Sequence, residues 1–318
     1  MIGFSFSKKK EDKRILLTDF IFLHISKIKK SKTYKRSYRN VAKHISNFQK
    51  KTGIVLYSDN MTEQVSEEFL SYLQSDDARI KGKQKFGLMA NTVNSLWQKV
   101  CHILRKARDA GYNVNLGYTN VETHEEEVNA IALSIEELQR INELKNLSPE
   151  AMAVRDRFLL GCYTALRYSD YSKLTSENII GNTITLKTRK TGVRVVIPVH
   201  PIIRDILNRN NGGFPKLPTQ QAFGATIKRV CKKAGINNYE MYERTFGTNV
   251  VRKRVKKYTL ISSHTARRTG ATNMYLAGIQ TFRIMLITGH KTEEAFFKYI
   301  RIEKHENAKT LAEHSFFQ

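Results

Sequence analysis

Two segments near the C-terminus read HTARRTGAT (residues 264–272) and TGHKTEEAFFKYI (residues 288–300). They place two imidazoles, a guanidinium and a phenol in a short ordered series: His264, Arg267, His290 and Tyr299. Because His264 and Arg267 are three positions apart, they share one face of the helix that we predict there. The series predicts a cationic site that contains a phenolic nucleophile.

Two cations upstream complete this set. Arg167 lies in TALRYSD (residues 164–170) and Lys190 lies in RKTGVRVVIP (residues 189–198). A phosphodiester resists attack because its free oxygens are already negative, so a catalyst must bring cations to them. A guanidinium donates two parallel hydrogen bonds and keeps its charge at any working pH. We therefore expect Arg167 and Arg267 to hold a phosphate. His264 and His290 would add hydrogen-bond donors or carry protons.

Tyr299 is the nucleophile that this chemistry favours. Attack by a phenol makes a covalent phosphodiester, so the bond energy is kept and rejoining needs no ATP. A free phenol has a pKa of about 10, so its proton must pass to His264 or to solvent during the attack. The departing 5′ oxygen needs a proton, which Lys190 can donate from a hairpin turn. Asp170 is expected to hold an active-site cation through a carboxylate hydrogen bond.

Nothing in the sequence requires a cofactor. No acidic cluster indicates paired Mg²⁺ ions, and no G-x-x-x-x-G-K-[ST] segment indicates a nucleotide site. Cys101, Cys162 and Cys231 lie far apart, so we expect reduced thiols and neither a zinc site nor a disulfide framework. The predicted reaction is a transesterification of DNA strands without metal or cofactor.

The charge of the chain favours a nucleic acid as partner. Its 54 Lys and Arg residues outnumber 29 Asp and Glu residues, which gives a net charge of +25. Such a polycation is suited to neutralising many phosphates, so double-stranded DNA is the expected partner. No apolar run is long enough to span a bilayer, and residues 1–14 are charged where a signal peptide needs an apolar core. We expect a soluble cytoplasmic protein without a membrane partner.

The length and composition predict two domains. Residues 1–116 are expected to form a helical DNA-binding bundle, with helices at 17–28, 31–51, after Thr62, and from an N-cap at Asn91 to Gly111. Residues 117–131, a polar and acidic stretch, are expected to be a linker. The most basic residues of the bundle, which we expect to contact DNA, are Lys27, Lys29, Lys30, Lys32, Lys35, Arg36, Arg39, Lys81, Lys83 and Lys85. Such runs are also common on helix faces that meet only solvent.

Residues 132–318 are predicted to form an α+β catalytic domain, so that the whole chain is mainly α with a small β component. A capping box at Ser134 and a cap at Ser148 open its first helices. Alternating apolar residues at 182–200 predict a β-hairpin with Lys190 at its turn. Further helices are expected at 201–207, 219–234, 263–277, 281–287 and from 292 onward. The basic segment RKRVKK (residues 252–257) is expected to be an exposed strand or loop.

In these motifs the chain resembles the tyrosine recombinases of the phage integrase family, over nearly its whole length. All six catalytic positions of the family are filled in order. The resemblance implies site-specific recombination through a 3′-phosphotyrosine, a C-shaped clamp around DNA, and a homotetramer on two sites that exchanges strands through a Holliday junction. Because the bundle begins near Leu17, we expect a simple two-domain recombinase, or an integrase that works without arm sites. The biological outcome stays open among integration, excision, inversion and resolution.

Three questions stay open at this stage. A type IB topoisomerase has similar chemistry, although the helical first domain and the RKTG hairpin favour a recombinase. A DNA-binding protein with an inactive site is the other alternative, which the complete catalytic set disfavours. The C-terminal tail, residues 301–318, would dock on its own domain or, as the resemblance implies, on a neighbouring protomer.

Overall fold

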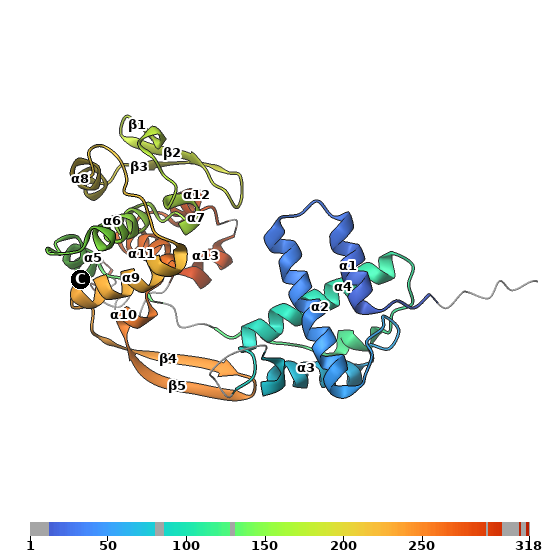
Figure 1. The fold of residues 1–318 in the computed structure, drawn as a ribbon. Coiled ribbons are helices and arrows are strands. Elements are labelled where there is room, and N and C mark those ends of the chain that lie inside the picture. The colour runs from blue at the N-terminus through green and yellow to red at the C-terminus, as the bar shows by residue number, and fades with distance from the viewer. Residues whose placement is uncertain are drawn as a thin grey trace, which may run out of the picture. The chain divides into compact units, whose positions relative to one another are not determined.

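The computed structural model describes residues 13–79, 86–127, 131–290, 292–300, 312, 316 and 317. Helices dominate these ranges and the strands form two small sheets, so the predicted mainly α fold with a small β component is confirmed (Figure 1). Contacts divide the chain into a first unit, residues 1–128 and 242–253, and a second unit, residues 129–241 and 254–318. Within the described ranges, no helix is both long and apolar enough to cross a membrane.

The first unit contains the predicted helical bundle. Its described helices are α1 (Leu17–Lys27), α2 (Lys32–Thr52), α3 (Glu63–Gln74) and α4 (Ala90–Asp109), with 3₁₀ turns η1 (Asp76–Ala78) and η2 (Leu116–Asn120). The helices predicted from Ser31 and after Thr62 are both capped, because the Ser31 and Thr62 hydroxyls accept hydrogen bonds from the first turns of α2 and α3. Phe48, Phe69 and Trp97 are fully buried in its core.

The prediction that Asn91 is an N-cap is wrong. Helix α4 begins at Ala90, with Met89 at the capping position and no side-chain cap. Asn91 instead pairs with the backbone of Glu126: its amide donates to the Glu126 carbonyl at 2.8 Å, and its oxygen accepts from the Glu126 N–H at 2.7 Å. An amide side chain reproduces the backbone pattern of donors and acceptors, which is why Asn91 serves this contact.

The stretch predicted as a linker packs against the first unit as far as it is described. The indole N–H of Trp97 donates to the Val121 carbonyl at 3.1 Å, and the Thr123 hydroxyl donates to Asn94 at 2.7 Å. Tyr118 is buried. Residues 128–130 lie outside the described residues. This acidic stretch is therefore bound to α4 by hydrogen bonds over the residues described.

The rest of the chain follows most of the predicted order. Its elements are α5 (Ile135–Asn142), α6 (Pro149–Thr164), α7 (Tyr168–Tyr171), η3 (Ser176–Asn178), β1 (Ile179–Ile180), β2 (Thr183–Lys187), β3 (Arg194–Pro198), α8 (Pro201–Arg209), α9 (Gln220–Lys233), β4 (Tyr239–Phe246), β5 (Asn249–Lys256), α10 (Lys257–Leu260), α11 (Ser263–Leu276), α12 (Thr281–Thr288) and α13 (Glu293–Tyr299). The capping box at Ser134 and the cap at Ser148 are both present.

Two glycines let α6 and α11 approach each other closely. A Cβ atom on Gly270 of α11 would lie 2.2 Å from the Cys162 carbonyl oxygen of α6. A Cβ atom on Gly161 of α6 would lie 2.7 Å from the Tyr171 ring and 3.0 Å from Ala266 of α11. No other residue type fits at these distances, so the two glycines fix the separation of the helices that lead into the site.

The predicted hairpin is confirmed. Strands β1, β2 and β3 form one sheet in that order, and in the antiparallel β2–β3 pair Ile184 faces Ile197 and Leu186 faces Val195. Thr188–Val193 form the turn between them, closed by hydrogen bonds from the Thr188 N–H to the Val193 carbonyl and from the Gly192 N–H to the Thr188 carbonyl, both 2.8 Å. Lys190 is exposed in this turn, as predicted.

The RKRVKK segment lies mostly in a strand, β5, whose partner β4 was not predicted. The tip of this second hairpin, Tyr242–Lys253, belongs to the first unit. There the Gly247 N–H donates to the Leu88 carbonyl at 2.8 Å and the Thr245 N–H donates to a Glu126 carboxylate oxygen at 2.9 Å. Helix α10 follows β5 directly, and Lys257 at its start forms a 2.8 Å ion pair with the buried Glu137 of α5.

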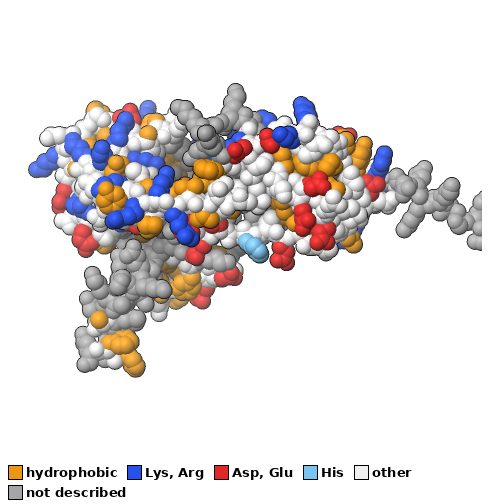
Figure 2. Space-filling model, turned by 90° about the horizontal axis from the view of Figure 1, so that it is seen from below, with side chains coloured by type: hydrophobic (Ala, Val, Ile, Leu, Met, Phe, Trp, Pro, Cys, Tyr) orange, Lys and Arg blue, Asp and Glu red, His pale blue; other side chains and the backbone are white. Residues whose placement is uncertain are grey.

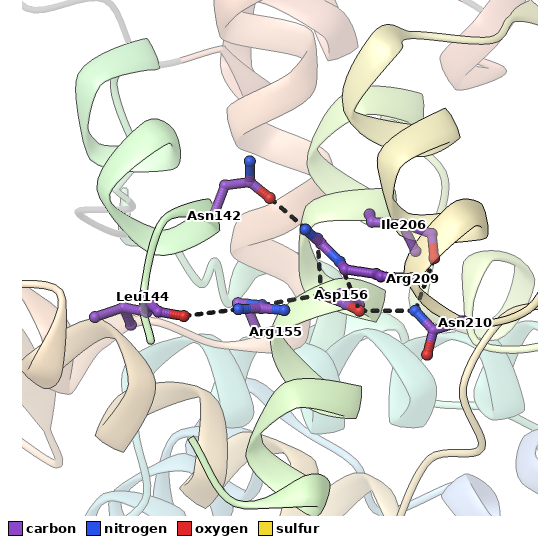
Figure 3. A network of polar contacts seen from close by, with 7 residues as sticks. All are labelled: Asn142, Leu144, Arg155, Asp156, Ile206, Arg209 and Asn210. Atoms are coloured by element: carbon purple, nitrogen blue, oxygen red, sulfur yellow. Dashed lines mark hydrogen bonds and ion pairs between the residues drawn. The ribbon is translucent and has the colours of Figure 1, made fainter. Parts of the chain in front are cut away.

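A buried carboxylate joins α6 to α8. Asp156 of α6 is 2% exposed and accepts hydrogen bonds from Arg155, Arg209 and Asn210 at 2.9 to 3.1 Å (Figure 3). Arg209 also donates to Asn142 at 3.0 Å. A buried charge is tolerated only when it is paired and hydrogen-bonded, and this network meets that requirement.

Candidate active site

Arg167 lies at the tight connection between α6 and α7. Ala165 ends α6 with a left-handed backbone, φ +50°, which is uncommon for a residue with a side chain. After this turn, Leu166 enters the core and Arg167 becomes the N-cap residue of α7. Nη1 of Arg167 is buried and has no hydrogen-bond partner among the described residues. A buried guanidinium N–H of this kind favours an anion beside it.

The motifs predicted from sequence meet around Gly289. A Cβ atom placed on Gly289 would lie 3.9 Å from Nη1 of Arg167 and 4.0 Å from Oγ1 of Thr191, which directly follows Lys190. Gly289 ends α12 in a left-handed conformation, φ +67°, and leads into His290. The arginine loop, the hairpin turn and the histidine segment are therefore neighbours in the second unit.

Asp170 holds the hairpin turn to α7. Its buried Oδ1 accepts a 2.9 Å hydrogen bond from the backbone N–H of Arg189. The sequence led us to expect a hydrogen bond to an active-site cation, whereas the hydrogen bond that the structure describes goes to this backbone amide. The reason is geometric: the turn residue beside Lys190 reaches α7 with its backbone. Asp170 therefore controls where Lys190 is displayed.

Arg267 is 2% exposed and connects the two ends of the site. Its Nη1 donates to the Ala165 carbonyl at 3.0 Å and its Nη2 donates to the Thr288 carbonyl. Nη2 also lies 3.4 Å from Nε2 of His290. Burial lowers the pKa of Arg267 to about 10, so the guanidinium stays charged at neutral pH. The backbone carbonyls orient this cation before any substrate arrives.

The hydrogen bonds around His290 define its tautomer. The Thr288 hydroxyl gives its one proton to the Ile284 carbonyl at 2.9 Å. Because Oγ1 of Thr288 is also 3.0 Å from Nδ1 of His290, Nδ1 must donate to it. Nε2 is then the acceptor that faces Arg267. Burial, followed by the charges of Arg267 and Arg167, lowers the pKa of His290 to about 4, so the ring is neutral at pH 7.

His264 lies at the start of α11 with an exposed edge, beside the Tyr299 ring at 5.4 Å between centroids. Desolvation of the ring, and then the neighbouring cations, lower its pKa to about 4. Solvent at the exposed edge moderates the desolvation, but the cations act in the same direction. The contributing charges, in decreasing order, belong to Arg268, Arg267, Arg167 and Lys190. A neutral imidazole beside a phenol is able to accept its proton.

Tyr299 ends α13 with its ring among these groups. The ring centroid is 5.0 Å from that of His290, and Cζ of Arg267 lies 5.6 Å from it. Its hydroxyl is buried and makes no geometrically sound hydrogen bond with a described residue. Burial raises the pKa of Tyr299, while the charges of Arg267, Arg268 and Arg167 oppose that rise. The site thus surrounds one phenol with cations and neutral imidazoles.

No group of three or more His, Cys, Asp or Glu side chains that could hold a metal occurs among the described residues. The three cysteines are free, two of them buried. Burial raises the pKa of Cys162 and of Cys231. These thiols are packing groups of the second unit, because a buried thiol with a raised pKa is a poor nucleophile and metal ligand.

The basic residues predicted to contact DNA lie in the first unit. Those described are exposed, except for the half-buried Lys35, and none takes part in an ion pair with another described residue. They occupy the end of α1, the turn and the start of α2: Lys27, Lys29, Lys30, Lys32, Lys35, Arg36 and Arg39. Lys81, Lys83 and Lys85 lie outside the described residues.

The roles of two neighbours of the site were not predicted. Thr288, within the quoted TGH motif, sets the tautomer of His290. Arg268, the second arginine of HTARR, contacts Tyr299.

The β4–β5 hairpin, which was also not predicted, carries cations over aromatic rings. Nζ of Lys256 lies 3.7 Å from the ring centroid of Tyr239, and Nζ of Lys253 lies 5.1 Å from that of Tyr242. Figure 2, seen from the side of this hairpin, shows Lys and Arg among apolar side chains there.

Two protein-family profiles match the chain, one in its N-terminal part and one in its C-terminal part. The profile of the phage integrase SAM-like domain matches residues 16–123, and that of the phage integrase family matches residues 132–306. No curated protein sequence matches the chain. The second profile alone covers more than half of the chain.

Solved structures share the fold at low sequence identity. A lambda integrase dimer bound to a COC′ core site has a TM-score of 0.65 at 15% identity, covering 94% of this chain and 85% of that chain. A lambda integrase tetramer bound to a Holliday junction has a TM-score of 0.62 at 17% identity, covering 91% and 83%. The Tn1549 transposon integrase with circular intermediate DNA has a TM-score of 0.61 at 14% identity, covering 94% and 100%. With both profiles matched in order along one chain, this protein belongs to the phage integrase family, the tyrosine recombinases that its motifs resemble.

Proposed function

We propose that this site-specific tyrosine recombinase cleaves a DNA strand with the Tyr299 phenol and rejoins it to a different strand end. Five further side chains serve this step: Arg167, Lys190, His264, Arg267 and His290. The observation that carries the assignment is the place of Tyr299, whose buried phenol lies among a guanidinium and two neutral imidazoles. A phenol that attacks a phosphate needs cations and a proton acceptor beside it.

In the cleavage step, Oη of Tyr299 bonds to phosphorus while the bond from phosphorus to the 5′ oxygen breaks. The phenol proton passes to the neutral ring of His264, and Lys190 gives a proton to the departing oxygen. The products are a 3′-phosphotyrosine and a free 5′-hydroxyl strand. Rejoining is the reverse of this step with another 5′-hydroxyl, so no energy source is consumed.

The arginines and His290 stabilise the charge that develops on the phosphate. Arg267 is fixed by two backbone carbonyls, so its guanidinium is oriented before the phosphate binds, and the buried Nη1 of Arg167 remains available to donate to that phosphate. Preoriented donors cost little reorganisation, and removing one commonly costs about 3 to 4 kcal/mol in the transition state. His290 changes tautomer or gains a proton when it donates to phosphate through Nε2.

DNA is the substrate that the charge of the chain supports, since +25 over 318 residues favours many phosphate contacts. We extend to this chain the DNA-bound dimer and the tetramer on a Holliday junction known for lambda integrase. Four copies would hold two duplexes. The first unit would act as the DNA-binding domain, through the exposed cations at the end of α1 and the start of α2.

A nicked suicide substrate tests the proposal. Wild type is expected to form a covalent protein–DNA adduct that survives denaturing electrophoresis, because the nick lets the 5′ fragment diffuse away. Tyr299→Phe is expected to bind the same DNA with unchanged affinity and to form no adduct, since only the nucleophilic oxygen is lost. An adduct formed by Tyr299→Phe would show that another side chain is the nucleophile.

A further inference from the structure

Helix α13 carries the nucleophile and is only seven residues long. An isolated helix of this length is not stable, so its position depends on contacts with the rest of the second unit. Phe296 and Ile300 anchor it in a small core with Ala271 and Ile284. These apolar contacts hold the inner face of α13, and they leave open what fixes its C-terminal end, where Tyr299 lies.

Arg268 contacts that end in two ways. Its Nε donates a 3.1 Å hydrogen bond to the backbone carbonyl of Tyr299. Its Cζ also lies 4.9 Å from the centroid of the Tyr299 ring, closer than the 5.6 Å of Arg267. The last carbonyls of a helix have no partner within the helix, and a cation there is favoured by the helix dipole. One guanidinium therefore satisfies the end of α13 and covers the ring of its last residue.

Arg268 also lies one helical turn after His264 on α11. It is half-buried, and its charge is the first among those that lower the pKa of His264. The same charge opposes the rise in the pKa of Tyr299. Arg268 thus borders both the phenol that gives up a proton and the imidazole that we expect to take it.

We propose that Arg268 is a positioning residue that docks the nucleophile: it fixes the end of α13 through the Tyr299 carbonyl and orients the phenol in the site of its own chain. This inference rests on the proposed function, because it assigns a role toward Tyr299 as nucleophile. Arg268 differs from Arg167 and Arg267 in that it donates a hydrogen bond to the tyrosine backbone. We therefore expect its removal to affect the placement of the phenol more than the binding of DNA.

The test compares Arg268→Gln and Arg268→Lys with Arg283→Gln as a matched control. Arg283 is an exposed arginine of α12 whose Nε donates to Gln280 at 3.0 Å. Each variant is measured for DNA affinity and for the first-order rate of adduct formation at saturating suicide substrate. We expect Arg268→Gln to lower that rate by about 10-fold to 100-fold, the effect of one charge-assisted hydrogen bond on a barrier. DNA affinity should change less than about 3-fold, as for Arg283→Gln.

Arg268→Lys is expected to recover at least half of the lost rate on a logarithmic scale, because an ammonium can donate to the same carbonyl and keeps the charge. Equal rates for Arg268→Gln and Arg283→Gln would overturn the inference. So would a loss of DNA affinity with an unchanged saturated rate, which would make Arg268 a DNA contact. Absence of recovery in Arg268→Lys, with both variants folded by circular dichroism, would reduce Arg268 to a packing role. Failure of the proposed function is a distinct result, namely no adduct with wild type.

Discussion

The backbone N–H of Arg189 donates a 2.9 Å hydrogen bond to Oδ1 of Asp170, and this bond ties the turn that displays Lys190 to helix α7. Arg167 lies three residues before Asp170, so in the proposed mechanism one four-residue segment contributes a phosphate-binding cation and the support of the general acid. The hairpin turn is held beside Arg167, while the Lys190 side chain is exposed to solvent.

Lys190→Ala is expected to cleave ordinary DNA about 10² to 10⁴ times more slowly than wild type, because the 5′ oxygen leaves without a proton donor. On a substrate with sulfur at the bridging 5′ position the rate should recover, since a thiolate leaves without protonation. The comparison is made on single-turnover cleavage. Arg167→Ala should stay impaired on both substrates, and equal impairment of Lys190→Ala on both would assign Lys190 to binding.

Asp170→Ala should, like Lys190→Ala, cleave the sulfur substrate better than ordinary DNA. Loss of the hydrogen bond to Arg189 frees the turn, so cleavage of ordinary DNA should slow by about 10-fold to 100-fold and the sulfur substrate should be cleaved with a smaller deficit. Asp170→Asn keeps an acceptor for the Arg189 amide and should lie between Asp170→Ala and wild type. The idea fails if the deficit of Asp170→Ala is the same with oxygen and with sulfur.

Stability should fall with acidity because of the site histidines. The pKa of His290 is lowered to about 4 from 6.5, so between these values the unfolded chain binds more protons than the folded one. The contribution of neutral His290 to the free energy of unfolding is complete above pH 6.5 and is lost as the pH falls toward 4. We expect the urea midpoint to drop between pH 7.5 and 5, and to drop less in His290→Asn. The exposed His124, replaced by Asn, serves as the control and should leave the wild-type drop unchanged.

Cleavage should persist in excess EDTA and without nucleotide, because the groups that stabilise the phosphate in our scheme are side chains. The suicide-substrate adduct is measured after dialysis against EDTA, with and without added Mg²⁺. DNA affinity itself should decrease steeply with added salt, as phosphate contacts release counterions. Loss of adduct in EDTA that Mg²⁺ restores, at unchanged DNA occupancy, would contradict the scheme.

Gly270→Ala should destabilise the protein by about 3 kcal/mol or more, since its Cβ would meet the backbone carbonyl oxygen of Cys162 at 2.2 Å. Gly224→Ala in α9 is the matched change, because a Cβ there meets nothing within 4 Å. It should stabilise the chain by about 0.5 to 1 kcal/mol through helix propensity. Urea unfolding followed by circular dichroism measures both, and similar effects of the two changes would refute the close-packing argument.

Local signals in the sequence predicted most helices and the β2–β3 hairpin. Ser31, Thr62, Ser134 and Ser148 are capping residues whose hydroxyls act within four residues, so a short window of sequence is enough to recognise them. Asn91 has the same chemistry, but its partner is Glu126, and a contact over that separation leaves no local signal. Strand β4 lacks clean alternation, because its tyrosines lie under cations instead of in a core.

The types and order of the residues proposed for the site come from sequence motifs, whereas their mutual arrangement was not predicted. Arg267 was expected to hold a phosphate, and two of its described hydrogen bonds go to the carbonyls of Ala165 and Thr288. Both carbonyls lie at helix C-termini, at the end of α6 and the end of α12, where they have no partner within the helix. A pattern of side chains in the sequence does not indicate where such carbonyls meet. The bond from Arg189 to Asp170 likewise involves a backbone amide, and backbone groups are the same at every position of a sequence.

The second hairpin bears on how such a protein evolves. Its tip belongs to the first unit and its base to the second, so the first unit is encoded by two separate stretches of the gene. A single genetic crossover near residue 128 would exchange Leu88 and Glu126 while leaving behind Gly247 and Thr245, to which they are bonded. Modular replacement of the first unit by simple gene fusion is therefore penalised. Inheritance of the two units becomes linked, and, if the first unit binds the target DNA as we propose, related chains with new specificities should arise by substitution more readily than by domain shuffling.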